Sequence, residues 1–97
     1  MPVFVMIGRD GPEALERRPG IRPRHLAHLE PLSRQGRILF AGPLFQDDGR
    51  TPRGSVVVFT ADTLEEARAI AARDPYVTGG VFASHEVAPS TRVFPAG

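Results

Sequence analysis

The sequence contains no cysteine and no lysine, and each absence excludes a class of structure or partner. Without cysteine the chain has no disulfide and no thiolate metal site, and nothing in it calls for an oxidising compartment. Without lysine its 12 basic residues are all arginines, which nearly balance 11 acidic residues. These arginines are scattered along the chain, except for one loose group, so the long basic stripe that binds a phosphate backbone is missing. That group is Arg17, Arg18, Arg22 and Arg24. We therefore expect no nucleic-acid partner.

Long apolar runs are also missing, so no segment is long enough to span a bilayer. The first predicted strand follows Met1 directly, without the charged segment, apolar segment and cleavage site of a signal peptide. We therefore expect a cytoplasmic protein with no membrane partner. A length of 97 residues suits a single core. We expect one domain over residues 1–97, with a C-terminal tail at 90–97.

Short runs rich in β-branched and aromatic residues predict β-strands. The polar, turn-forming stretch 46–53 between the second and third runs predicts a hairpin. The first and third runs are apolar on both alternating faces, because consecutive side chains in each of them are hydrophobic. The predicted strands are residues 2–8, 37–45, 54–60 and 81–87.

The first predicted helix spans residues 21–35 and follows a loop that contains Pro19 and Gly20. Pro31 lies in the middle of this segment and is expected to bend or interrupt the helix. Gly36 supplies a C-terminal stop signal. The apolar residues at helical spacing are Leu26, Leu29 and Leu32.

The second predicted helix starts at Thr63 and Glu66, which match a capping box, and it ends near Arg73. Asp74 and Pro75 then form a start signal for a further short turn, with the aspartate as cap and the proline at the first position.

The resulting order of strand, helix, strand, strand, helix, strand favours an α+β fold, the ferredoxin-like βαββαβ sandwich. In it, two helices cover one face of a four-stranded antiparallel sheet. The other sheet face is left bare although it is apolar, and an exposed apolar patch marks an interaction site. We therefore expect two copies to pack sheet against sheet as a homodimer.

The same topology predicts which residues meet. The start of the first helix, the end of the second strand, the start of the third strand and the end of the second helix share one end of the domain. Those places hold His25, Gly42-Pro43, Gly54-Ser55 and Asp74-Pro75-Tyr76.

His25 and Asp74 admit two interpretations from the residues alone. An imidazole oriented by a carboxylate is a pair suited to proton transfer near neutral pH. Alternatively, His25 is a solvated residue of the first turn and Asp74 only caps the turn after the second helix. Arg22 is suited to holding a carboxylate and Ser55 to donating a hydrogen bond to an anion.

The other histidines are weaker candidates. His28 lies three residues after His25, but two histidines without a third ligand are a weak metal signal, and we interpret it as a surface residue. His85 lies in the fourth predicted strand and is interpreted as a sheet-surface residue. We expect no metal.

Several short motifs give the chain a resemblance to a known family. It resembles the YciI-like family of small dimeric α+β barrel proteins, over nearly its whole length. The motifs that carry the resemblance are Arg22-Pro23-Arg24-His25-Leu26, Gly36-Arg37-Ile38-Leu39, Ala41-Gly42-Pro43-Leu44, Gly54-Ser55, Asp74-Pro75-Tyr76-Val77 and Gly80-Val81-Phe82.

This resemblance implies a ferredoxin-like protomer, a sheet-to-sheet dimer and a pocket whose active site is formed by His25 and Asp74. Relatives with known chemistry act on small cyclic or aromatic metabolites by isomerisation, dehydrohalogenation or related proton transfer. We therefore predict a cofactor-free enzyme that uses this pair on a small-molecule ligand. The alternative is a non-catalytic small-molecule-binding or assembly module. The predicted ligand-binding residues are Arg22, Gly42, Pro43, Ser55 and Tyr76.

Overall fold

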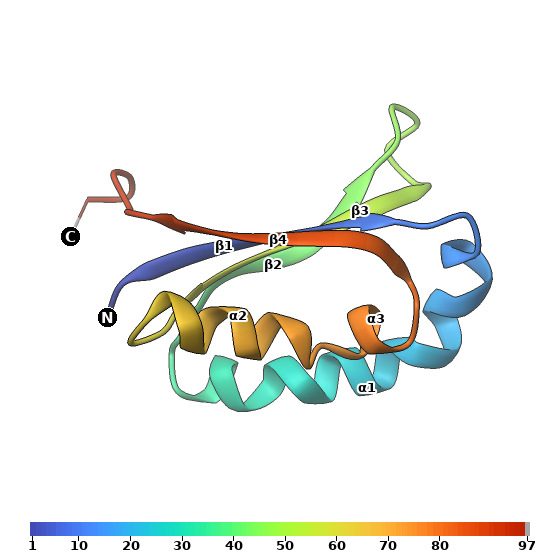
Figure 1. Cartoon of the computed structure of the whole chain (residues 1–97). Helices are drawn as coiled ribbons and strands as arrows, with labels where there is room; N and C mark the ends of the chain where they lie inside the picture. Colours follow the sequence, from blue (N-terminus) through green and yellow to red (C-terminus); the bar gives the residue numbers. More distant parts are fainter. Residues whose placement is uncertain (97) are drawn as a thin grey trace.

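An antiparallel sheet with spatial order β2-β3-β1-β4 carries all the helices on one of its faces in the computed structural model, which describes residues 1–96 (Figure 1). The predicted ferredoxin-like α+β class is confirmed. The elements in chain order are β1 (Val3–Asp10), α1 (Ala14–Arg34), β2 (Ile38–Phe45), β3 (Pro52–Thr60), α2 (Leu64–Ala72), α3 (Pro75–Thr78) and β4 (Phe82–Ser90).

The core lies between the sheet and the helices because alternate strand residues point to that side. Phe4 and Met6 of β1 are each 3% exposed, and Val57 and Phe59 of β3 lie beside them. The rings of Phe4 and Phe59 are tilted, with centroids 6.4 Å apart. The hairpin between β2 and β3 is confirmed. Strand ends differ from the prediction because polar residues also pair, and β4 ends at Ser90 rather than at 87.

Helix α1 begins at Ala14, seven residues before the predicted start, so the expected loop around Pro19 and Gly20 is wrong. The helix also continues through Pro31 to Arg34 without interruption. A helical proline frees the carbonyl four residues earlier. These prolines lie on exposed positions, where water can satisfy the freed carbonyls. Within residues 1–96, no helix combines the length and apolar character required to cross a membrane.

The buried side of α1 differs from the predicted row of leucines. Leu32 is buried and Leu29 is half-buried, but Leu26 is 44% exposed. His25 occupies the core-facing position instead and is 9% exposed. The apolar spacing predicted the wrong residue at this turn, because His25, which is held by a polar partner, takes the inner position in place of Leu26.

The capping signals correctly predicted where α2 and α3 begin. The Thr63 hydroxyl accepts from the Glu66 amide at 3.1 Å. The Glu66 carboxylate accepts from the amide of Asp62 at 2.9 Å, not from that of Thr63 as in a reciprocal capping box. Asp74 caps α3, with Pro75 at its first position.

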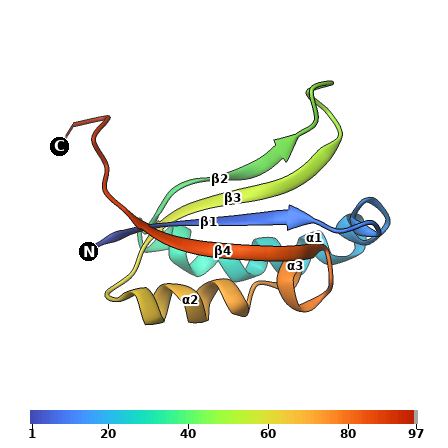
Figure 2. The ribbon, with the colours of Figure 1, turned by 45° about the horizontal axis from the view of Figure 1, so that its top comes forward.

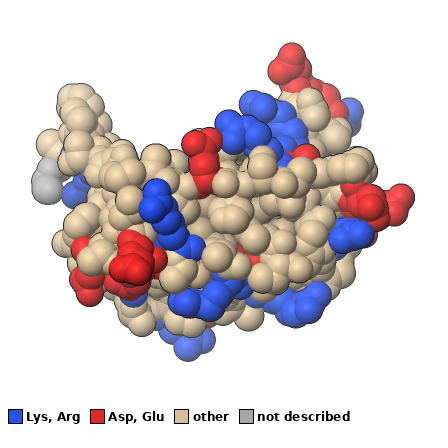
Figure 3. Space-filling view, in the orientation of Figure 1, with Lys and Arg blue, Asp and Glu red and all other residues tan. Residues whose placement is uncertain are grey.

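The sheet face opposite the helices is uncovered (Figure 2). Cross-strand pairing places an apolar group of residues on this face, and Phe40 is 60% exposed. The β2–β3 hairpin and the C-terminal segment stand above this face at its two ends (Figures 1 and 3). We call this group the open face: Val3, Val5, Ile7, Phe40, Val56 and Val58.

Candidate active site

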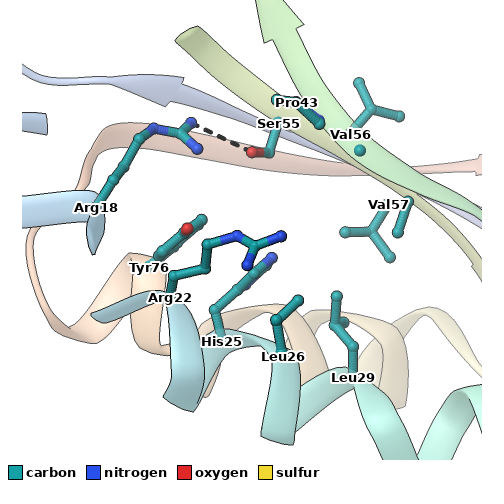
Figure 4. Close-up of a pocket in the computed structure, with 12 residues that line it drawn as sticks. Arg18, Arg22, His25, Leu26, Leu29, Pro43, Ser55, Val56, Val57 and Tyr76 are labelled. Atoms are coloured by element: carbon teal, nitrogen blue, oxygen red, sulfur yellow. Dashed lines mark hydrogen bonds between the residues drawn. The ribbon is translucent and has the colours of Figure 1, made fainter. Parts of the chain in front are cut away.

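A cavity of about 200 Å³ lies between α1 and the β2–β3 part of the sheet (Figure 4). Its helical wall follows the spacing four, three, one and three along α1, which brings side chains of successive turns to one side. Tyr76 of α3 closes one end. The helical wall is formed by Arg18, Arg22, His25, Leu26 and Leu29, and the sheet contributes Ala41, Gly42, Pro43, Ser55, Val56 and Val57.

His25 and Asp74, 49 residues apart in the sequence, are in direct contact. The Nδ1 atom of His25 lies 2.8 Å from Oδ1 of Asp74, whose residue is 1% exposed. An ionised carboxylate only accepts hydrogen bonds, so Nδ1 carries the proton and donates it. In the neutral imidazole, Nε2 is then the atom with a free lone pair. The ring borders the cavity, where a base of this kind can meet a ligand.

Asp74 makes both of the contacts that the sequence left as alternatives, with His25 and with the start of the next helix. Its Oδ1 atom accepts from Nδ1 of His25 and also from the backbone N–H of Tyr76 at 2.9 Å. The second bond is the N-cap of α3, so the start of this helix fixes the carboxylate relative to α1. The buried carboxylate is therefore held by two donors.

Tyr76 holds the imidazole from its other side. The two rings are stacked, with centroids 3.9 Å apart and planes 4° from parallel. Phe82 meets the tyrosine ring edge-on at 5.6 Å. Burial raises the pKa of the Tyr76 phenol above its ordinary value of 10.0, although the positive charges of Arg18 and Arg22 act in the opposite direction. The phenol is therefore neutral at physiological pH and stays a hydrogen-bond donor.

Arg18 is a residue of this site that the sequence interpretation did not select. Its guanidinium lies 5.0 Å from the centre of the Tyr76 ring and forms a two-point ion pair with Asp10. It was overlooked because the helix was predicted to start at residue 21. A helix drawn from residue 14 would have aligned Arg18, Arg22 and His25 on one side, at spacings of four and three.

The predicted ligand-binding residues all border the cavity. Arg22 has no hydrogen-bond or ion-pair partner within residues 1–96, which leaves its charge available at the cavity wall. Gly54, beside Ser55, has a different role. A Cβ atom at this position would collide with the carbonyl oxygen of Gly8 in β1. This glycine therefore allows β1 and β3 to approach closely.

His28 and His85 do not join the cavity. Nε2 of His28 donates to the carbonyl of Ile70 at 2.9 Å, so this half-buried side chain links α1 to α2 and is not fully solvated. His85 is exposed on β4. Residues 1–96 contain no group of three or more histidine, cysteine, aspartate or glutamate side chains placed to hold a metal ion.

The site therefore combines a histidine oriented by a buried carboxylate, an unpaired arginine, a serine hydroxyl and an apolar wall. Such a set can move a proton on a bound compound and balance a negative charge that develops on it. Each group comes from a different turn or strand, and the fold alone brings them together.

Comparisons with known proteins agree with this fold and extend over nearly the whole chain. A family model described as the YCII-related domain matches residues 2–91. Protein YciI of Escherichia coli O6:H1 is 39% identical over 97 residues, covering 95% of this chain and 99% of its own. An uncharacterized protein of Haemophilus influenzae is 38% identical over 96 residues, covering 94% and 98%.

A solved structure with the same fold is that of 5-chloro-2-hydroxyhydroquinone dehydrochlorinase (TftG) from Burkholderia phenoliruptrix, in complex with 2,5-dihydroxybenzoquinone. It is 28% identical, with a TM-score of 0.79, and the match covers 92% of this chain and 93% of that one. From the family model and these relatives we conclude that the chain belongs to the YCII-related family.

Proposed function

We propose that this protein is a cofactor-free enzyme in which His25 exchanges protons with a small oxygenated cyclic or aromatic compound. The observation that carries the proposal is the geometry of His25. Its Nδ1 atom is bound to the buried Asp74 at 2.8 Å, while its ring borders the cavity. An imidazole held in one tautomer beside a carboxylate is suited to act as a general base and then as a general acid.

The dehydrochlorination named for the Burkholderia relative illustrates how this pair would work. In a chlorinated trihydroxybenzene, one hydroxyl proton is moved to the ring carbon that bears chlorine. A second hydroxyl proton then leaves, a C=O bond forms, and chloride departs with the electron pair of the C–Cl bond. The substrate loses HCl overall. Nε2 of His25 receives and delivers these protons, and Asp74 stabilises the imidazolium between the transfers.

The cavity limits the substrate by size and charge. Its volume of about 200 Å³ lies below the roughly 300–1,000 Å³ of sites for drug-sized ligands. A single six-membered ring with oxygen substituents fits this scale. Leu26 and Leu29 offer the ring an apolar surface, and the unpaired Arg22 guanidinium is placed to balance an oxyanion.

The proposal is tested by screening chlorinated hydroxyhydroquinones and cyclic lactones with the wild type and His25→Ala. Turnover by the wild type and its loss in His25→Ala are expected. Turnover that survives the substitution would remove His25 from the mechanism. Binding without turnover in the wild type would instead favour the non-catalytic small-molecule-binding module.

We also propose that the protein is a homodimer through the open face. The residues of β1, β2 and β3 on this face are apolar, and Phe40 is 60% exposed, which is unusual for a surface that water covers. The β4 edge of the same sheet face carries Glu86, which pairs with Arg9. A second copy presents the same apolar group, as a two-fold symmetric interface requires. The raised hairpin and C-terminal segment in Figure 3 flank the face without covering its centre.

A further inference from the structure

The guanidinium of Arg18 borders the cavity, but its charge is already balanced by the protein. Nε donates to Oδ2 of Asp10 at 2.9 Å and Nη2 donates to Oδ1 at 2.8 Å. The side chains of Arg18 and Asp10 are only 11% and 8% exposed. A two-point ion pair of this kind has defined geometry and is little screened by solvent. Arg18 therefore does not serve as the counter-ion of a ligand, in contrast to the unpaired Arg22.

The same guanidinium reaches the sheet. Nη2 has two hydrogens: one is donated to Asp10, and the other is shared between the carbonyl of Gly54 at 3.0 Å and Oγ of Ser55 at 3.3 Å. A serine hydroxyl has one proton and two lone pairs. Because the Arg18 N–H occupies one lone pair, the hydroxyl proton of Ser55 points away from the guanidinium. Ser55 is 6% exposed and borders the cavity. The dashed line in Figure 4 marks its hydrogen bond with Arg18.

We propose that Asp10 and Arg18 are positioning residues that hold the Ser55 hydroxyl as a hydrogen-bond donor into the cavity, facing a carbonyl or oxyanion oxygen of the ligand. Ser55 lies on the sheet side of the cavity and His25 on the helix side (Figure 4). The ligand therefore carries two oxygen functions at separate ring positions: an acidic hydroxyl at His25 and an acceptor oxygen at Ser55. This inference rests on the proposed function and narrows its substrate class to such rings.

The decisive experiment is a double-mutant cycle on ligand affinity with Arg18→Lys and Ser55→Ala, using 2,5-dihydroxybenzoquinone as the probe and calorimetry as the measurement. Lysine keeps the charge but lacks the planar fork that contacts both partners. We expect Ser55→Ala to weaken binding about 10- to 100-fold, the size of a lost hydrogen bond to a charged acceptor. Arg18→Lys should weaken it in the wild type but add little in the Ser55→Ala background.

A merely structural role of Arg18 gives a different result, because the loss would be the same in both backgrounds. Equal losses, or wild-type affinity in Ser55→Ala, would overturn the inference. Ser55→Thr keeps the hydroxyl and should restore most of the affinity. Ser33→Ala and Arg24→Lys, exposed positions on α1 outside the cavity, are matched controls that should bind as the wild type does.

A second readout needs no ligand and no activity, so it separates this inference from the proposed function. High-resolution crystal structures of the wild type and Arg18→Lys should show the Ser55 side chain in one rotamer in the former and redistributed in the latter. If the Ser55 rotamer were the same in both structures, Arg18 would not position the Ser55 hydroxyl. Conversely, a protein that binds the probe as predicted but turns over no substrate would refute the catalytic proposal and leave the positioning pair intact.

Discussion

At the scale of single residues, Asp74 connects two parts of the site, which its position in the sequence after α2 did not indicate. One carboxylate oxygen serves both as the cap of α3 and as the acceptor for His25. The sequence predicted that these residues lie at one end of the molecule, since topology determines it. It did not predict the stacking of Tyr76 on His25 or the Asp10–Arg18 pair, because both depend on side-chain directions that element order does not define.

Replacing Asp74 by asparagine should separate the two roles of this residue. The amide oxygen still accepts from the Tyr76 N–H, so α3 should keep its cap, whereas the neutral group no longer stabilises an imidazolium. We expect kcat/KM on a chlorinated hydroxyhydroquinone to fall by about 10²- to 10⁴-fold. Asp62→Asn, an exposed aspartate before α2, is the matched control. Equal rates for Asp74→Asn and the control would contradict the pairing.

Tyr76 is the chain's single tyrosine, and tryptophan is absent, so phenolate absorbance reports this residue alone. Because burial raises its pKa, its ionisation in the folded protein should occur above pH 10.0. The unfolded chain releases this proton first. The contribution of Tyr76 to the free energy of unfolding is therefore complete below pH 10.0 and is lost as the pH rises through the folded-state pKa. A phenol that titrates at its ordinary value in the folded protein would show that the ring is solvated.

At the scale of elements, α1 shows where sequence reasoning failed and why. Proline and glycine at positions 19 and 20 are usual loop signals, yet both lie inside a helix. Tertiary packing overrides their low helix propensity because Ala14 and Ile21 bury the helix against the core. Strand and cap signals were more reliable. Strand hydrophobicity and the capping residues Thr63 and Asp74 act locally, so they can be recognised without tertiary context.

Two glycine substitutions test this account of the elements. Gly20 lies within α1 with open space where a Cβ would project, so Gly20→Ala should stabilise the protein by about 0.5–1 kcal/mol. Gly54→Ala should destabilise it by about 1–3 kcal/mol, because the new methyl group forces β1 and β3 apart. Urea unfolding of both variants and the wild type measures the two differences. If both substitutions stabilised the protein, or both destabilised it, the environment described for one of the two glycines would be wrong.

At the scale of the whole molecule, the fold class followed from the order of elements, and the bare sheet face followed from the fold. Only one sheet face is covered by helices (Figures 1 and 2). That β1 and β3 are apolar on both faces was readable in the sequence, and it predicted a second contact, since a strand with one face in water usually carries polar residues on that face. The sequence of one chain does not identify the partner of the open face. A second copy is the expected partner because a two-fold symmetric interface brings the same surface of two copies together.

Sedimentation equilibrium should give twice the chain mass of 10.5 kDa for the wild type at micromolar concentration. Val58→Asp places a charge in the centre of the open face, where it would be buried without a partner, and should shift the protein toward monomer. Leu15→Asp, at an exposed apolar position of α1 that is 58% exposed, is the control and should not change the mass. A wild-type mass of one chain would refute the homodimer.

The central claim is that His25 moves the proton, and it is tested most directly by comparing His25→Gln with His28→Gln. Glutamine retains hydrogen bonding at both positions but cannot accept a proton as imidazole does. His28, three residues away on the same helix, is bound to the Ile70 carbonyl outside the cavity. We predict that kcat/KM for chloride release from a chlorinated hydroxyhydroquinone falls by about 10²- to 10⁴-fold in His25→Gln and stays at the wild-type value in His28→Gln. Equal rates in all three proteins would contradict the account.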